Sequence, residues 1–116
     1  DDAHFKVHDY FGAWVMVKSN ENSPSNILEN LKFGNYYCSQ GPTIEDIFIE
    51  DGLVNVISSP IERLVICGDG TAAKYINCKN NSKNEIPFGR CEGSPWIRIT
   101  IIDQKGNRAW TNPIWL

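Results

Sequence analysis

The sequence lacks several features that would assign it to a common functional class. Its basic residues are scattered and its formal net charge is -3. This predicts neither a nucleic-acid partner nor an anionic membrane as a partner, because both are bound by basic patches. No apolar run is long enough to cross a bilayer. We expect no signal peptide in this sequence, and because its first residue is not Met, we expect a processed product or a piece of a longer chain.

The cysteines also lack a recognisable pattern. Cys38, Cys67, Cys78 and Cys91 include no C-x-x-C pair, which excludes the usual zinc spacing. Their density is below that of a disulfide scaffold, so reduced and mostly buried thiols are the favoured interpretation. A disulfide between two of Cys67, Cys78 and Cys91 remains the alternative if the chain is exported.

What is present suffices for one folded domain, with 116 residues of which 41% are hydrophobic. Residues 12–18, GAWVMVK, are typical of a buried strand. Ser23-Pro24 resembles a helix N-cap followed by Pro at the first helical position, and Gly34 supplies a stop. These signals predict one short helix over residues 24–33.

After Pro42 the pattern is β only. Asp51-Gly52 predicts a two-residue hairpin loop, because both positions need positive φ. A second turn is expected at Asp69-Gly70, and Pro113 should place the last strand at an edge or end it early. The expected strands cover residues 43–50, 53–59, 61–68, 71–78, 96–103 and 108–116. Residues 79–94 are polar and are expected to be irregular.

Short strands with frequent turns predict a mainly β fold, an immunoglobulin-like β-sandwich with one short helix near the N-terminus. The change from mixed α and β to β alone places a domain boundary at Pro42. The two expected units are therefore residues 1–42 and residues 43–116.

The acidic residues and histidines at the start of the chain form its most conspicuous cluster: Asp1, Asp2, His4, His8 and Asp9. In an extended segment Asp2 and His4 project to the same side, so one ion could contact both. A carboxylate with an imidazole suits Zn, Mn or Fe. Two ligands do not hold a catalytic ion, however, and taken alone the cluster fits a solvated, frayed terminus better.

Three stretches change that balance: D-A-H at residues 2–4, the segment GNYYCSQGP at residues 34–42, and AWTNPIW at residues 109–115. Their order resembles the C-terminal part of the PHP-domain (polymerase and histidinol phosphatase) metal-dependent phosphoesterases. The resemblance covers nearly the whole chain and is weakest over residues 68–94. Where the family pattern favours small residues and often Thr, this chain has Cys38 and Gln40.

The resemblance implies that residues 1–42 are the truncated C-terminal end of a PHP catalytic domain and that residues 43–116 are its β-rich accessory domain. Asp2 and His4 would be ligands of a divalent metal cluster, with Mn, Zn or Fe as the cofactor in the full-length parent. His8 and Asp9 match no ligand motif. The other ligands would lie in the missing N-terminal catalytic domain, which is the expected partner. The parent would hydrolyse phosphoesters, and this piece alone would be inactive, hold no cofactor and be cytoplasmic.

Two other functions remain open. Trp14, Trp96, Trp110 and Trp115 could form an aromatic platform in a carbohydrate- or protein-binding module, although core packing is the commoner fate of tryptophan. The β-domain could instead act structurally, through contact with the catalytic domain or through self-association. In that case the strand at residues 12–16 should pair with the β-domain or with a second copy.

Overall fold

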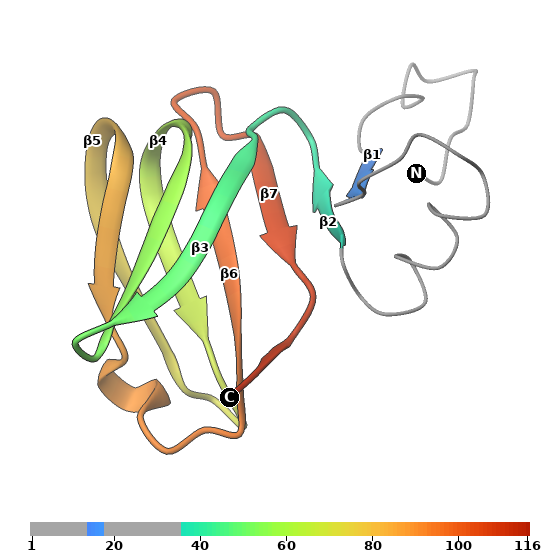
Figure 1. Ribbon diagram of the computed structural model, residues 1–116. Helices are drawn as coiled ribbons and strands as arrows, with labels where there is room; N and C mark the ends of the chain where they lie inside the picture. The colour runs from blue at the N-terminus through green and yellow to red at the C-terminus, as the bar shows by residue number, and fades with distance from the viewer. Residues whose placement is uncertain (1–13, 18–35) are drawn as a thin grey trace.

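The described residues of the computed structural model, 14–17 and 36–116, form an antiparallel β-sheet that curls around a hydrophobic core (Figure 1). In the described part of the chain, the helical residues are confined to one short 3-10 turn, η2. The elements in chain order are β1 (Trp14–Val17), β2 (Tyr36–Ser39), β3 (Ile44–Glu50), β4 (Leu53–Cys67), β5 (Ala73–Pro87), η2 (Gly89–Cys91), β6 (Trp96–Ile102), β7 (Arg108–Thr111) and β8 (Ile114–Trp115). The mainly β fold is therefore confirmed. The helix predicted over 24–33 lies outside the described residues.

The sheet has the strand order β1-β2-β7-β6-β4-β3, with β5 also paired to β4 and β8 also paired to β6. The pairs β1–β2, β2–β7, β6–β7 and β4–β6 are all antiparallel. The strand predicted near residues 12–18 is present as β1, but it pairs with β2, which precedes Pro42, and not directly with a strand of residues 43–116. β2 precedes the predicted boundary at Pro42, yet it pairs with β7 near the end of the chain.

The long strand β4 is responsible for the curl. Its first half lies between β3 and β5, and its second half lies between β5 and β6. Between the halves the register with β5 shifts twice, between Ile57 and Ile61 and between Ile61 and Arg63. Pro60 sits in this interval and has no N–H to give to a ladder. The sequence predicted two strands separated by Pro60, and this was wrong, because the bulge absorbs the proline without ending the strand.

The polar segment after residue 78 is also different from the prediction. Residues 79–87 continue β5 instead of forming an irregular loop. Lys79 and Asn80 have φ of 51° and 63° and accommodate the bulge opposite β4. Because β5 pairs with β4 alone and most of its side chains are exposed, its strand character does not require alternating apolar residues. That exposure is why the hydrophobic pattern failed here.

The core lies inside the curl, between the two halves of β4 and strands β5, β6 and β7. β6 alternates between buried and outward residues, and its Ile97, Ile99 and Ile101 are each 0% exposed. They pack in one cluster with buried aliphatic residues of β4 and β5: Val54, Val56, Ile61, Leu64, Ile66 and Ile86. Burial of a large aliphatic side chain contributes roughly 1.5–3 kcal/mol, so this cluster is the main source of stability.

The predicted turns are present. Asp51 and Gly52 join β3 to β4 with φ of 52° and 74°, the conformation expected of a tight hairpin loop. The loop between β4 and β5 is closed by the Gly68 N–H, which donates to the Ala72 carbonyl at 2.9 Å. β7 ends at Thr111, two residues before Pro113, and β8 begins after it, so the single strand predicted over residues 108–116 is interrupted at Pro113. No helix in the described ranges is long and apolar enough to cross a membrane.

Candidate functional site

The predicted metal ligands Asp2 and His4, together with His8 and Asp9, lie outside the described residues. Within residues 14–17 and 36–116, no group of three or more His, Cys, Asp or Glu side chains is placed to hold a metal ion. The metal site therefore stays a prediction from the sequence. The structure does describe most of the other two segments that carry the resemblance, residues 36–42 and 109–115.

The segment 34–42 ends in a turn built around a buried serine. Ser39 is 0% exposed, and its hydroxyl donates to the Pro42 carbonyl at 2.6 Å. The same oxygen accepts the Gly41 N–H at 3.0 Å. Tyr37 also stabilises the turn, because its hydroxyl accepts the Ile44 N–H at 3.0 Å. The side chains of β2 thus fix the chain direction between β2 and β3.

Residues 36–42 and 109–115, the described parts of two of the resembling segments, are neighbours in space. β2 pairs with β7 through Cys38 opposite Trp110 and Ser39 opposite Ala109. Beyond the ladder, the Gln40 N–H donates to the Arg108 carbonyl at 2.7 Å. The Gln40 side-chain oxygen accepts the Arg108 N–H at 3.1 Å. Residues separated by about half the chain therefore form one seam.

The end of the chain continues this seam with a bulge. β7 and β8 both pair with β6, but the register changes by one residue between them. At the break, the Ile99 N–H donates to the Thr111 side-chain hydroxyl at 3.1 Å. The interrupted ladder leaves the buried Ile99 N–H without a backbone acceptor, and this bond satisfies it. The bulge lets Ile114 face the core while Trp115 faces outward.

The register places Trp96, Trp110 and Trp115 on the outer side of the sheet. Trp96 of β6 lies directly opposite Trp115 of β8, so the two side chains share one face. Trp115 is 73% exposed, whereas Trp96 and Trp110 are half-buried. The sequence-based interpretation treated Trp110 and Trp115 as residues of one strand, but they lie on different strands.

Trp110 belongs to a row that runs straight across five strands. The row consists of Tyr75, Val65, Thr100, Trp110 and Cys38, each opposite the next. Tyr75 is 58% exposed and the other four are half-buried. An aromatic residue thus stands toward each end of the row, with smaller side chains between them.

Exposed arginines flank this row on both sides. On one side Arg63 and Arg108 lie opposite the same residue, Ile102, on the two neighbouring strands. On the other side Arg98 lies opposite Cys67. All three arginines are exposed. We call this surface the arginine face. It is the outward side of residues 73–77 of β5, residues 63–67 of β4, β6 and β7.

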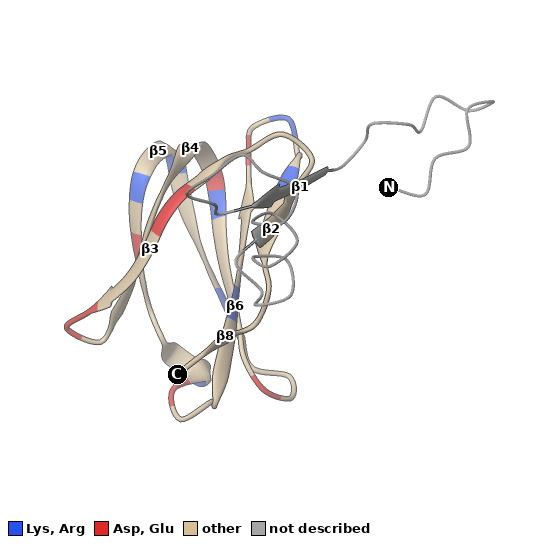
Figure 2. Cartoon of the chain, turned by 45° about the vertical axis from the view of Figure 1, so that its right-hand side comes forward, with Lys and Arg blue, Asp and Glu red and all other residues tan. Residues whose placement is uncertain are grey.

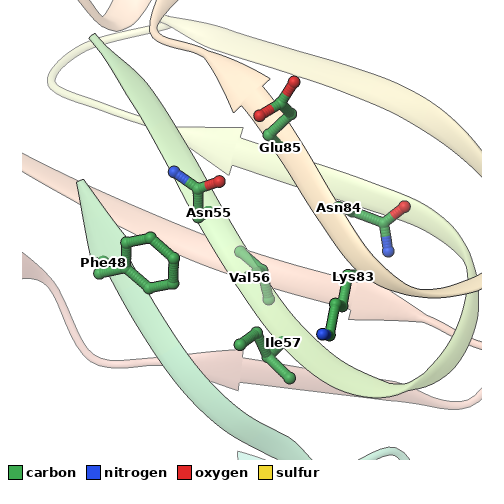
Figure 3. A pocket seen from close by; sticks show the side chains of 7 residues that line it. All are labelled: Phe48, Asn55, Val56, Ile57, Lys83, Asn84 and Glu85. Carbon is green, nitrogen blue, oxygen red and sulfur yellow. The ribbon is translucent and has the colours of Figure 1, made fainter. Parts of the chain in front are cut away.

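The opposite end of the sheet, around β3, carries acidic residues instead of arginines. Figure 2 shows acidic residues along β3 and at the hairpin that it forms with β4. The nearby outer surface of β3, β4 and β5 has a hollow of about 390 Å³ (Figure 3). Phe48 and Ile57 supply apolar lining, and Lys83 and Glu85 supply charges of opposite sign. Because these charges offset each other, the hollow favours no particular ligand.

The cysteines are free thiols in the structure. Burial raises the pKa of Cys78, and the negative charge of Glu62 raises it further. Burial likewise raises the pKa of Cys91, with a smaller contribution from Cys67. Such thiols are poor nucleophiles near neutral pH, because the thiolate is the reactive form. Cys38 is half-buried, so it is more accessible than the sequence suggested.

The arginine face is the feature that sequence reasoning missed. The only signal was the alternation in β6, which placed Arg98 and Thr100 on the side away from the isoleucines. Comparison with protein-family models, curated proteins and solved structures finds no match for the chain.

Proposed function

We propose that this chain is the C-terminal part of a PHP-type metal-dependent phosphoesterase. Residues 1–42 would end the catalytic domain, and residues 43–116 would form the accessory β-domain, a relative of the immunoglobulin-like sandwiches. The observation that supports this most is the seam between β2 and β7. It joins two of the three segments that carry the resemblance, although they are far apart in the sequence. Segments that form one structural unit have a physical reason to occur together.

In this proposal Asp2 and His4 are ligands of a divalent metal cluster. A carboxylate and an imidazole are donors suited to Mn, Zn or Fe. Two protein donors leave coordination positions open, and the remaining ligands would come from the catalytic domain that precedes this piece. When bound, such ions activate a water molecule and neutralise the oxygens of a phosphoester substrate. The piece alone would be inactive, and the parent would work in the cytoplasm.

The test compares this chain with a version extended upstream through the catalytic domain, using an aryl phosphoester as substrate. Only the extended version should hydrolyse it. Asp2→Ala and His4→Ala should each abolish hydrolysis, whereas His8→Ala, a matched control in the same segment, should retain it. Full activity of the extended protein after both Asp2→Ala and His4→Ala would contradict the proposal.

A second candidate function, a carbohydrate- or protein-binding module, is favoured by one observation. Trp96 and Trp115 are a cross-strand pair on the surface, and Trp115 is 73% exposed. Aromatic surfaces of this kind stack on the apolar faces of sugars or anchor a protein partner. Calorimetric titration with neutral oligosaccharides would test the sugar alternative. A Trp115→Ala variant should then lose the binding, and binding unchanged by this substitution would reject the tryptophan platform.

A further inference from the structure

We infer that the arginine face is a binding surface for single-stranded nucleic acid. The surface is defined by three arginines and three aromatic residues, Arg63, Arg98, Arg108, Tyr75, Trp96 and Trp110. The inference concerns binding only, so it does not depend on the proposed metal site. It departs from the expectation of no nucleic-acid patch, because strand pairing gathers basic residues that are scattered along the sequence.

Charge is the first argument. The chain has 14 acidic and 11 basic residues, yet the outward positions of residues 63–67, 73–77, 96–102 and 108–111, which make up the face, include three arginines and no Asp or Glu. Two acidic residues, Glu62 and Asp103, lie at one margin of the face, next in sequence to Arg63 and Ile102, and they offset part of the positive charge. Glu62 accepts a hydrogen bond from Gln104 at 3.2 Å, and Asp103 accepts two backbone N–H groups in its own turn. The face is therefore locally positive on an acidic chain, which suits an anionic ligand.

The choice of arginine is the second argument. The Arg63 guanidinium lies 4.8 Å from the centre of the Tyr75 ring. A guanidinium that stacks on an aromatic ring still presents N–H donors at its edge, in a geometry that matches phosphate oxygens. Arg63 and Arg108 are two strands apart, or about 10 Å between their Cα atoms. Several phosphates of one extended strand could therefore be contacted at once.

The aromatic residues are the third argument, and they distinguish nucleic acid from other polyanions. Tyr75 and Trp110 stand on the same row, three strands apart, at a separation of about 14 Å. The half-buried Val65 and Thr100 between them leave the aromatic side chains as the large groups of the row. Single-stranded nucleic acids combine phosphates with flat bases, and proteins bind them with positive surfaces on which bases stack on aromatic side chains. A sulfated or carboxylated polysaccharide would use the arginines but has no bases to stack.

The test is fluorescence anisotropy of a labelled deoxythymidine oligomer of about 12 nucleotides, titrated with the full chain in the presence of EDTA. We expect saturable binding in the micromolar range at low salt. Three phosphate contacts predict a loss of affinity of about twentyfold between 50 and 200 mM salt. Arg98→Gln should reduce the slope of log affinity against log salt by about 0.7, whereas Arg98→Lys should retain it.

The aromatic contribution is tested separately. Tyr75→Ala should weaken binding roughly tenfold, and Tyr75→Phe should restore it, because stacking needs the ring and not the hydroxyl. Phe48→Ala and Lys83→Gln, in the hollow on the other part of the sheet, serve as matched controls and should change affinity less than about twofold. Thermal unfolding of each variant verifies that it is folded.

Three outcomes would overturn the inference. One is absence of binding up to about 100 µM protein, the weak end of non-specific nucleic-acid affinities. Another is heparin binding as tightly as the oligonucleotide with no effect of Tyr75→Ala, which would indicate a general polyanion surface. The third is displacement of the oligonucleotide by a neutral oligosaccharide, which would indicate the sugar platform instead. Because the measurement contains a chelator, none of these outcomes bears on the proposed metal site.

Discussion

Ser39→Ala is the substitution that most directly probes the turn between β2 and β3. Ser39 is 0% exposed, and its hydroxyl makes two hydrogen bonds, to the Pro42 carbonyl at 2.6 Å and from the Gly41 N–H at 3.0 Å. Alanine removes both bonds and leaves a buried carbonyl and an N–H with reduced hydrogen bonding. An intramolecular hydrogen bond contributes about 1 kcal/mol net, and an unsatisfied buried group costs about 1–3 kcal/mol. We therefore expect the free energy of unfolding to fall by about 2–3 kcal/mol.

Urea unfolding followed by circular dichroism measures this change, and the thermal midpoint should fall by roughly 8–12 °C for a domain of this size. Ser59→Ala is the matched control. The Ser59 hydroxyl accepts the Thr43 N–H at 2.9 Å, but this bond is exposed to solvent. Water can replace that bond, so we expect a loss below about 1 kcal/mol. If Ser39→Ala were no more destabilising than Ser59→Ala, the structural role assigned to Ser39 would be refuted.

Three further predictions concern the hairpin, the core and the thiols. Gly52→Ala should destabilise the protein by about 1–2 kcal/mol through backbone strain alone, because φ at Gly52 is 74° and no atom lies near the added Cβ; an unchanged urea midpoint would contradict this. Ile99→Ala should lower the free energy of unfolding by about 2–5 kcal/mol, whereas Ile49→Ala, at a side chain that is 46% exposed, should have a much smaller effect. The raised pKa values of Cys78 and Cys91 mean that the folded state holds these protons more tightly than the unfolded state. Their contribution to stability is therefore fully present below the unfolded pKa of about 8.5 and is lost as pH rises through the folded pKa. Urea midpoints at neutral and alkaline pH should show this loss, and the doubly substituted Cys78→Ala, Cys91→Ala protein should show less of it; an equal loss in both proteins would assign the pH dependence to other groups.

The parts of the fold that follow from local chemistry were predicted from the sequence. The isoleucines of β6 alternate with polar residues, and the structure buries all three of them. Asp51-Gly52 predicted a tight hairpin, and both residues have positive φ. Such signals depend on residues two or three positions apart, so they remain valid whatever the distant partner strands are.

The parts that depend on distant partners were not predicted. Pro60 ends a strand in most settings, but the register shift between β4 and β5 removes the need for its missing N–H. The polar residues of β5 form a strand because they face solvent at the edge of the sheet. Pairing also creates the arginine face, since Arg63 and Arg108 become neighbours only through Ile102 of β6. No spacing within the sequence reveals a contact that is set by three strands.

The candidate metal site has a different status. Asp2 and His4 lie outside the described residues, and they remain predicted ligands that depend on the resemblance and on the chemistry of their donors. A direct test must therefore measure the metal and not the β-domain.

The central claim is tested most directly by the metal content of two purified proteins, this chain and a version extended through the proposed catalytic domain, measured by mass spectrometry after dialysis. The account predicts that the extended protein retains bound divalent metal, that Asp2→Ala and His4→Ala each reduce the amount, and that the present chain retains none. Stoichiometric metal on the present chain alone, lost on substitution of Asp2, His4 or His8, would show a self-sufficient site and would contradict the proposal that this chain is one piece of a larger metal centre.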